Sequence, residues 1–148
     1  MRLGRRIAFD YGDVRIGVAI SDASGVLATP LTTLLNIKEK LPSELIAIFN
    51  EYDPIYIAIG QPKHLSGDSS AKEISVANFV QELRAISALP IYGVDERLTT
   101  VSAARTLKEQ GKNSKQAKSE IDQVAAAAIL ESALNQERVN GEPLNRIL

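Results

Sequence analysis

The chain has 148 residues with a formal net charge of −1, and 45% of its residues are hydrophobic against 24% charged, which is typical of one globular domain. Because cysteine is absent and histidine occurs once, a disulfide framework, a thiol nucleophile and histidine-rich metal sites are excluded. Neither a membrane-spanning run of about 18 apolar residues nor a secretory signal is recognised, so we expect a cytoplasmic protein.

The first third of the chain predicts three antiparallel strands joined by turns. The strands are expected at residues 7–11, 15–21 and 26–34. In the second strand Gly17 and Ala19 alternate with larger apolar residues, so we expect another element to pack closely on their side.

The rest of the chain alternates between helical and strand patterns. Short apolar runs predict buried strands at 55–59 and 91–94. Apolar residues at helical spacing predict helices over 41–52, after Ser70, from Thr99 or Thr100 to Gly111, and from Ile121 to Leu134. Helical crossovers make the later strands parallel to the first. We therefore expect an α/β fold, with a mixed five-stranded sheet covered by helices on both faces.

Three acidic residues stand where carboxylates are unusual. Asp10 lies among apolar residues of the first strand, Glu96 follows the strand at 91–94, and Asp122 lies among the apolar residues of the last helix. The carboxyl ends of parallel strands share one sheet edge, where open α/β sheets build their sites. The last helix, packed on the sheet, could bring Asp122 to the same place.

Three converging carboxylates favour a bound cation. At a separation of ~4 Å they repel by roughly 4 kcal/mol per pair in a surface-like dielectric, and a divalent ion reverses that repulsion. Oxygen ligands favour Mg²⁺ or Mn²⁺. Two such ions can activate a water and stabilise the leaving oxygen in phosphodiester hydrolysis. We therefore expect Asp10, Glu96 and Asp122 to be both metal ligands and catalytic residues.

Each acid also has a simpler interpretation. Asp10 could begin a turn with Gly12. Asp122 closes a capping-box pattern that starts at Ser119. Glu96, with its neighbour Asp95, could favour the positive end of the next helix. Taken singly, none of the three signals decides between these roles.

Basic residues cluster in the same region of the sequence. Such a cluster beside a carboxylate edge would hold phosphates near the metals, and the alternative is a solvated helix face. The candidate nucleic-acid-binding residues are Arg97, Arg105, Lys108, Lys112, Lys115 and Lys118, the last three expected in a loop. His64 is interpreted as a loop residue, since the sequence shows no catalytic partner for it.

Five blocks of the sequence resemble the YqgF (RuvX) family, which is similar to RNase H-like nucleases and Holliday junction resolvases. The blocks are in order and span nearly the whole chain: residues 7–12, 15–19, 59–62, 94–100 and 121–126. The block Asp95-Glu96-Arg97-Leu98-Thr99-Thr100 is the most specific of them. Gln61 departs from the pattern, because the family often has an apolar residue there.

The resemblance implies an RNase H-like fold with strand order 3-2-1-4-5, the second strand antiparallel. It also implies a cytoplasmic, metal-dependent nuclease that processes the 5′ end of pre-16S rRNA in ribosome biogenesis. Asp10, Glu96 and Asp122 match the family's acidic positions. The implied partners are structured RNA, including a ribosomal precursor particle, or branched DNA, while the oligomeric state is not visible in the sequence.

The sequence is also compatible with functions of other classes. Cleavage of Holliday junction DNA is the rival within the nuclease class, because no residue pattern here reads a ribose 2′-hydroxyl. A non-catalytic nucleic-acid-binding module fits the near-neutral net charge. An actin-like or sugar-kinase-like ATPase shares the Asp-x-Gly strand turn, but that architecture needs two such domains.

Overall fold

The computed structural model describes residues 1–62, 71–96 and 115–148, with side chains of the last range from Lys118 onward. In chain order the elements are β1 (Ile7–Tyr11), β2 (Arg15–Ser21), β3 (Ala28–Leu35), α1 (Leu41–Tyr52), β4 (Ile57–Gln61), α2 (Ala71–Ile86), β5 (Ile91–Asp95) and α4 (Lys115–Asn140). The predicted helix from Thr99 or Thr100 to Gly111 lies outside the described residues. Within the described ranges, no helix is both long and apolar enough to cross a membrane.

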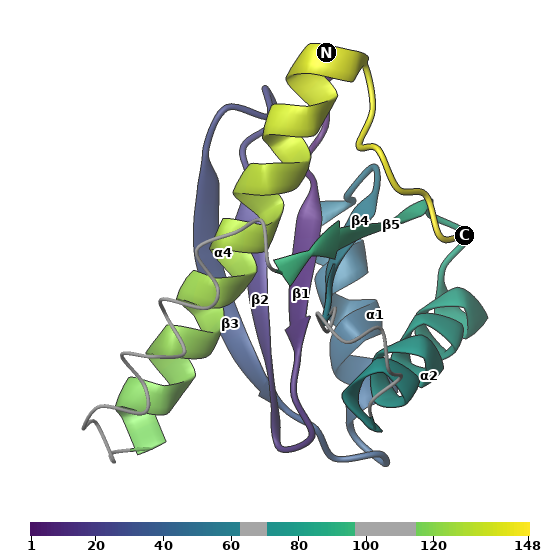
Figure 1. Cartoon of the computed structure of the whole chain (residues 1–148). Coiled ribbons are helices and arrows are strands. Elements are labelled where there is room, and N and C mark those ends of the chain that lie inside the picture. The colour runs from purple at the N-terminus through teal and green to yellow at the C-terminus, as the bar shows by residue number, and fades with distance from the viewer. Residues whose placement is uncertain (63–70, 97–114) are drawn as a thin grey trace.

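The five strands form one mixed sheet in the order β3-β2-β1-β4-β5. The first three strands pair antiparallel, and β4 runs parallel to both β1 and β5. Helices α1 and α2 cover one face and α4 crosses the other (Figure 1). The predicted α/β architecture and its strand order are confirmed.

The two faces of the sheet carry different residue types because successive side chains alternate. Ile7 and Phe9 of β1 belong to a core of large apolar side chains under α1 and α2. Ala8, Ala19 and Ala58 face α4 instead. Small side chains on that face let the helix approach closely, as the pattern of β2 predicts. A Cβ atom on Gly17 would overlap the backbone carbonyl of Asp122 in α4.

Several predicted boundaries are wrong. The fourth strand covers Ile57–Gln61 rather than 55–59, because its pairing with β5 continues through Gly60 and Gln61. The last helix runs over Lys115–Asn140. Lys115 and Lys118 therefore lie in a helix and not in a loop. Apolar periodicity marks only the part of α4 that packs on the sheet, so it misses the polar ends.

The C-terminal tail runs antiparallel along β5, the edge strand of the sheet (Figure 1). The backbone N–H of Ile91 donates to the carbonyl of Leu148 at 3.0 Å, and that of Gly93 donates to the carbonyl of Asn145 at 2.8 Å. These bonds occupy backbone groups that an uncovered edge would present to another chain.

Candidate functional site

A row of three residues across the centre of the sheet organises the site. Asp10 of β1 pairs directly with Gly17 of β2. On the other side, Phe9 pairs with Ile59, so Gly60 of β4 follows at the level of Asp10. Side-chain alternation from Ala8 places Asp10 on the face that α4 covers. The interpretation of Asp10 as a turn residue is therefore wrong, because it lies within a strand.

The two glycines make room for the other two acids. Over Gly60, an added Cβ would come within 2.7 Å of Oε1 of Glu96. Over Gly17, it would overlap the backbone carbonyl of Asp122. Glu96 and Asp122 therefore lie against the residues on either side of Asp10. All three acids are buried, with 4% of Asp10, 8% of Glu96 and 7% of Asp122 exposed.

Asp10 and Asp122 share a cavity, whereas Glu96 does not line it. The cavity has a volume of about 190 Å³ and lies at the β1–β2 turn, between α2 and α4. Its lining is Asp10, Tyr11, Gly12, Asp13, Val14, Arg15, Lys72 and Asp122. Across the ranges that the structure describes, no three Asp, Glu, His or Cys side chains gather closely enough to hold a metal ion. The three acids thus occupy one face of the sheet without forming a complete ligand group.

Arg15 contacts one of these acids and is a site residue that the sequence analysis missed. Its Nε donates to Oδ2 of Asp122 at 2.8 Å, with 17% of the Arg15 side chain and 10% of the Asp122 side chain exposed. A buried carboxylate needs a positive or hydrogen-bonding partner. The apolar surroundings of Asp122 in the sequence therefore indicate that it has such a partner. They do not identify Arg15, because it lies 107 residues away in the chain.

The position of Asp122 within α4 also excludes the helix-cap interpretation. The helix α4 covers Lys115–Asn140, so Ser119 and Asp122 are interior residues. The hydroxyl of Thr33 in β3 donates to the carbonyl of Ser119 at 2.8 Å. Together with the Arg15 contact, this bond fixes the start of α4 over β2 and β3.

The chemistry of the acids fits a hard divalent cation. Asp10 and Asp122 offer carboxylate oxygens in one cavity, and such oxygens are the ligands that Mg²⁺ and Mn²⁺ prefer. Asp10, Glu96 and Asp122 each take part in a polar or electrostatic interaction, so none is an isolated buried charge. A metal at Asp122 would share this carboxylate with Arg15, as metal-ligating carboxylates commonly do with a hydrogen-bond donor.

Most of the predicted nucleic-acid-binding residues are not placed by the structure. Arg97, Arg105, Lys108 and Lys112 lie outside the described residues, as does His64. Lys115 lies in α4, and the partly buried Lys118 follows one turn later. Their role in binding phosphates stays a prediction.

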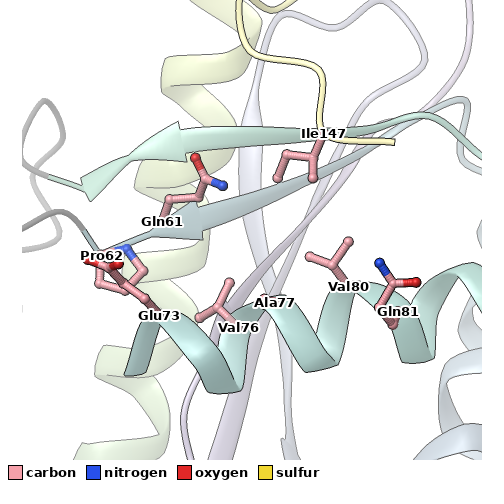
Figure 2. A pocket seen from close by; sticks show the side chains of 8 residues that line it. All are labelled: Gln61, Pro62, Glu73, Val76, Ala77, Val80, Gln81 and Ile147. Atoms are coloured by element: carbon pink, nitrogen blue, oxygen red, sulfur yellow. The ribbon is translucent and has the colours of Figure 1, made fainter. Parts of the chain in front are cut away.

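Two further cavities lie away from the three acids. One, of about 240 Å³, is enclosed by the end of β4, one side of α2 and Ile147 of the C-terminal tail (Figure 2). Another, of about 420 Å³, lies beside α1 and includes Asn36 and Lys38. Neither is lined by Asp10, Glu96 or Asp122, so the shared cavity of Asp10 and Asp122 is the candidate functional site.

Comparisons with known proteins converge on one family. The profile of the RuvX family, described as Holliday junction resolvase, matches residues 4–136. A relative from Streptomyces coelicolor, named "Putative pre-16S rRNA nuclease", is 44% identical over 97% of this chain and 87% of its own. A relative of the same name from Streptomyces avermitilis is 44% identical over 96% of this chain and 92% of its own.

Two solved structures with the same fold belong to a protein of low sequence identity to this chain. Thermus thermophilus RuvC in complex with a Holliday junction substrate aligns with a TM-score of 0.61 at 11% identity, covering 97% of this chain and 99% of that one. Another Thermus thermophilus RuvC structure aligns with a TM-score of 0.57 at 12% identity, with the same coverage. At this identity the likeness shows the fold alone, which is RNase H-like.

Proposed function

The chain belongs to the RuvX family, and on that premise we propose that it is a metal-dependent nuclease that hydrolyses phosphodiester bonds in pre-16S rRNA in the cytoplasm. The observation that carries the proposal is the Gly17–Asp10–Gly60 row, with Asp122 and Glu96 against its two glycines. A structural core has no need to bury three carboxylates beside one another, since burying charge is unfavourable. A hydrolytic site that binds cations, by contrast, requires neighbouring carboxylates as ligands.

The three acids take distinct roles in this proposal. Asp10 and Asp122 would hold Mg²⁺ or Mn²⁺ in their shared cavity, and Glu96 would be a further ligand or position the attacking water. Bound at this site, one or two such ions would lower the pKa of a water and stabilise the charge that develops on the leaving oxygen. Gly17 and Gly60 leave the space that Asp122 and Glu96 fill beside Asp10.

The substrate is proposed to be structured RNA, including RNA in a ribosomal precursor particle. The names of the relatives from both Streptomyces species support pre-16S rRNA. The basic residues Arg97, Arg105, Lys108, Lys112, Lys115 and Lys118 would contact its phosphates. Branched DNA is the second candidate substrate, because the family itself is described by Holliday junction resolution.

The test of this proposal is Asp10→Asn in a cleavage assay with Mg²⁺. The substrates are an RNA that includes the 5′ region of pre-16S rRNA and a four-way DNA junction. Replacing a partner of a metal ligand costs about 10–100-fold in activity, so loss of a ligand itself should lower the rate of cleavage by at least about 100-fold.

Asp53→Asn is the matched control, because it makes the same chemical change at an exposed residue outside the cavity. Asp53 ends α1 in the left-handed conformation, with φ of 46°, which asparagine also adopts. This control should cleave like the wild type. If Asp10→Asn cleaves both substrates at the wild-type rate, the assignment of the site is wrong.

A further inference from the structure

Two cationic side chains from different elements line the cavity that Asp10 and Asp122 share. Arg15 begins β2, and Lys72 lies in the first turn of α2. Neither is among the basic residues that the sequence pattern assigns to nucleic-acid binding. From this placement we infer that Arg15 and Lys72 form a phosphate-binding subsite next to the carboxylates. The inference rests on the proposed function and adds to it the group that orients the phosphate.

The hydrogen bonds of Arg15 leave most of its guanidinium available. A guanidinium carries five N–H donors in a fixed planar fork. Only Nε is used, in the bond to Oδ2 of Asp122, and the terminal amino groups make no hydrogen bond in the described part of the chain. A planar pair of N–H donors matches the oxygens of a phosphate. Arg15 can therefore hold Asp122 through one nitrogen and a phosphate through the others.

Lys72 supplies a second positive charge from helix α2. It is partly buried, and within the described residues its ammonium group forms no salt bridge. A cavity of about 190 Å³ has the volume of roughly six water molecules in the liquid, which is enough for a phosphate group. The two cations thus line one space of suitable size, in which Arg15 also pairs with Asp122.

The charge of the cavity makes phosphate binding depend on a divalent ion. Three carboxylates line it, those of Asp10, Asp13 and Asp122, against the two cations Arg15 and Lys72. The net charge of these described side chains is negative and repels a phosphate. One divalent ion makes it positive, so phosphate and metal should each raise the affinity of the other.

The test is calorimetry of the full chain with Mg²⁺ alone, with inorganic phosphate alone, and with phosphate in the presence of Mg²⁺. The wild type should bind phosphate only in the presence of Mg²⁺. Lys72→Gln and Arg15→Gln should each weaken phosphate binding by about tenfold or more, because a charge-assisted hydrogen bond is lost. Lys72→Arg should restore most of the affinity.

The same titrations separate this role from a merely structural one. Lys72→Gln should bind Mg²⁺ as tightly as the wild type or more tightly, since it removes a positive charge from the cavity. Lys72→Gln also keeps the test decisive if Arg15→Gln disturbs folding. Arg84→Gln is the matched control on the same helix, because Arg84 does not line this cavity, and it should change neither affinity.

Each result decides between the two proposals. If both glutamine variants bind phosphate like the wild type in Mg²⁺, the subsite is wrong and the nuclease assignment stands on its own cleavage test. A wild type that binds phosphate equally well without Mg²⁺ overturns the coupling to the metal. A wild type that binds no Mg²⁺ overturns the metal site of the proposed function and the subsite with it.

Discussion

At the scale of single residues, the site depends on two glycines that differ in what surrounds them. The space over Gly17 is filled by the backbone carbonyl of Asp122, which cannot move without moving α4. The space over Gly60 is filled by the ends of two flexible side chains, Oε1 of Glu96 at 2.7 Å and Cδ1 of Ile129 at 2.6 Å. The same substitution should therefore have different consequences at the two positions.

Gly17→Ala should lower the free energy of unfolding by about 1–3 kcal/mol, the usual cost of overpacking a core. Gly60→Ala should cost less stability, because side chains can rotate away, but it should weaken Mg²⁺ binding and cleavage by moving Glu96. Urea unfolding and calorimetry of both variants would check this. Equal losses of stability, with Mg²⁺ affinity unchanged in Gly60→Ala, would contradict this account of Glu96.

The placement of three buried acids on one face of the sheet could be predicted from the sequence, while their partners could not. Asp10 interrupts an apolar strand, which is a local signal that any reader of the chain can see. The partner of Asp122 is Arg15, 107 positions away, and the space for Glu96 comes from Gly60 on a neighbouring strand. Such contacts depend on how the elements pack, so local patterns do not contain them.

At the scale of elements, α4 is attached to the sheet at both ends. Its second half carries Glu137, which is buried together with the fully buried Arg6. Nη2 of Arg6 donates to Oε2 of Glu137 at 2.7 Å, Nε donates to Oε1 at 3.1 Å, and the hydroxyl of Tyr56 donates to Oε1 at 2.9 Å. Burial and the charge of Glu137 raise the pKa of Tyr56 well above its ordinary value, so its hydroxyl keeps its proton and stays a donor to Glu137 even in alkaline solution.

Glu137→Leu should destabilise the protein by about 3–5 kcal/mol, because it leaves the charge of Arg6 buried without compensation. The change in the free energy of unfolding is measured by urea denaturation. Glu131→Leu is the matched control, since Glu131 is exposed on the same helix, and it should have little effect. The double variant Arg6→Met with Glu137→Leu should recover part of the loss. A loss below about 1 kcal/mol in Glu137→Leu would show that this pair does not anchor α4.

Where one face of a strand or helix is buried, the periodicity of its apolar residues predicted its bounds closely. The strands β1 and β2 and the helix α1 have the predicted bounds. The start of α4 does not, because residues 115–120 are mostly polar and give no apolar periodicity. Pairing likewise extends β4 beyond its apolar run to Gln61. Hydrogen bonding to a neighbouring strand, rather than hydrophobicity, decides where such an element ends.

At the scale of the whole molecule, strand order explains why residues far apart in the chain meet. The central position of β1 puts Asp10 between β2 and β4, and α4 crosses this part of the sheet (Figure 1). The family resemblance predicted this order, while the crossover rule predicted only that the later strands run parallel to the first. It could not show that Asp10 and Asp122 share a cavity that Glu96 does not line, because that depends on side-chain placement.

The proposed function requires these carboxylates to bind a hard cation, and a crystal soaked in Mn²⁺ would reveal that ion at its ligands. We expect anomalous density at Asp10 and Asp122, with the Glu96 carboxylate turned toward the ion. Asp10→Asn crystals under the same conditions serve as the control and should show much weaker density. Mn²⁺ bound only elsewhere, or absent while the wild-type carboxylates are well ordered, would contradict the claim and leave the sheet a scaffold without this metal site.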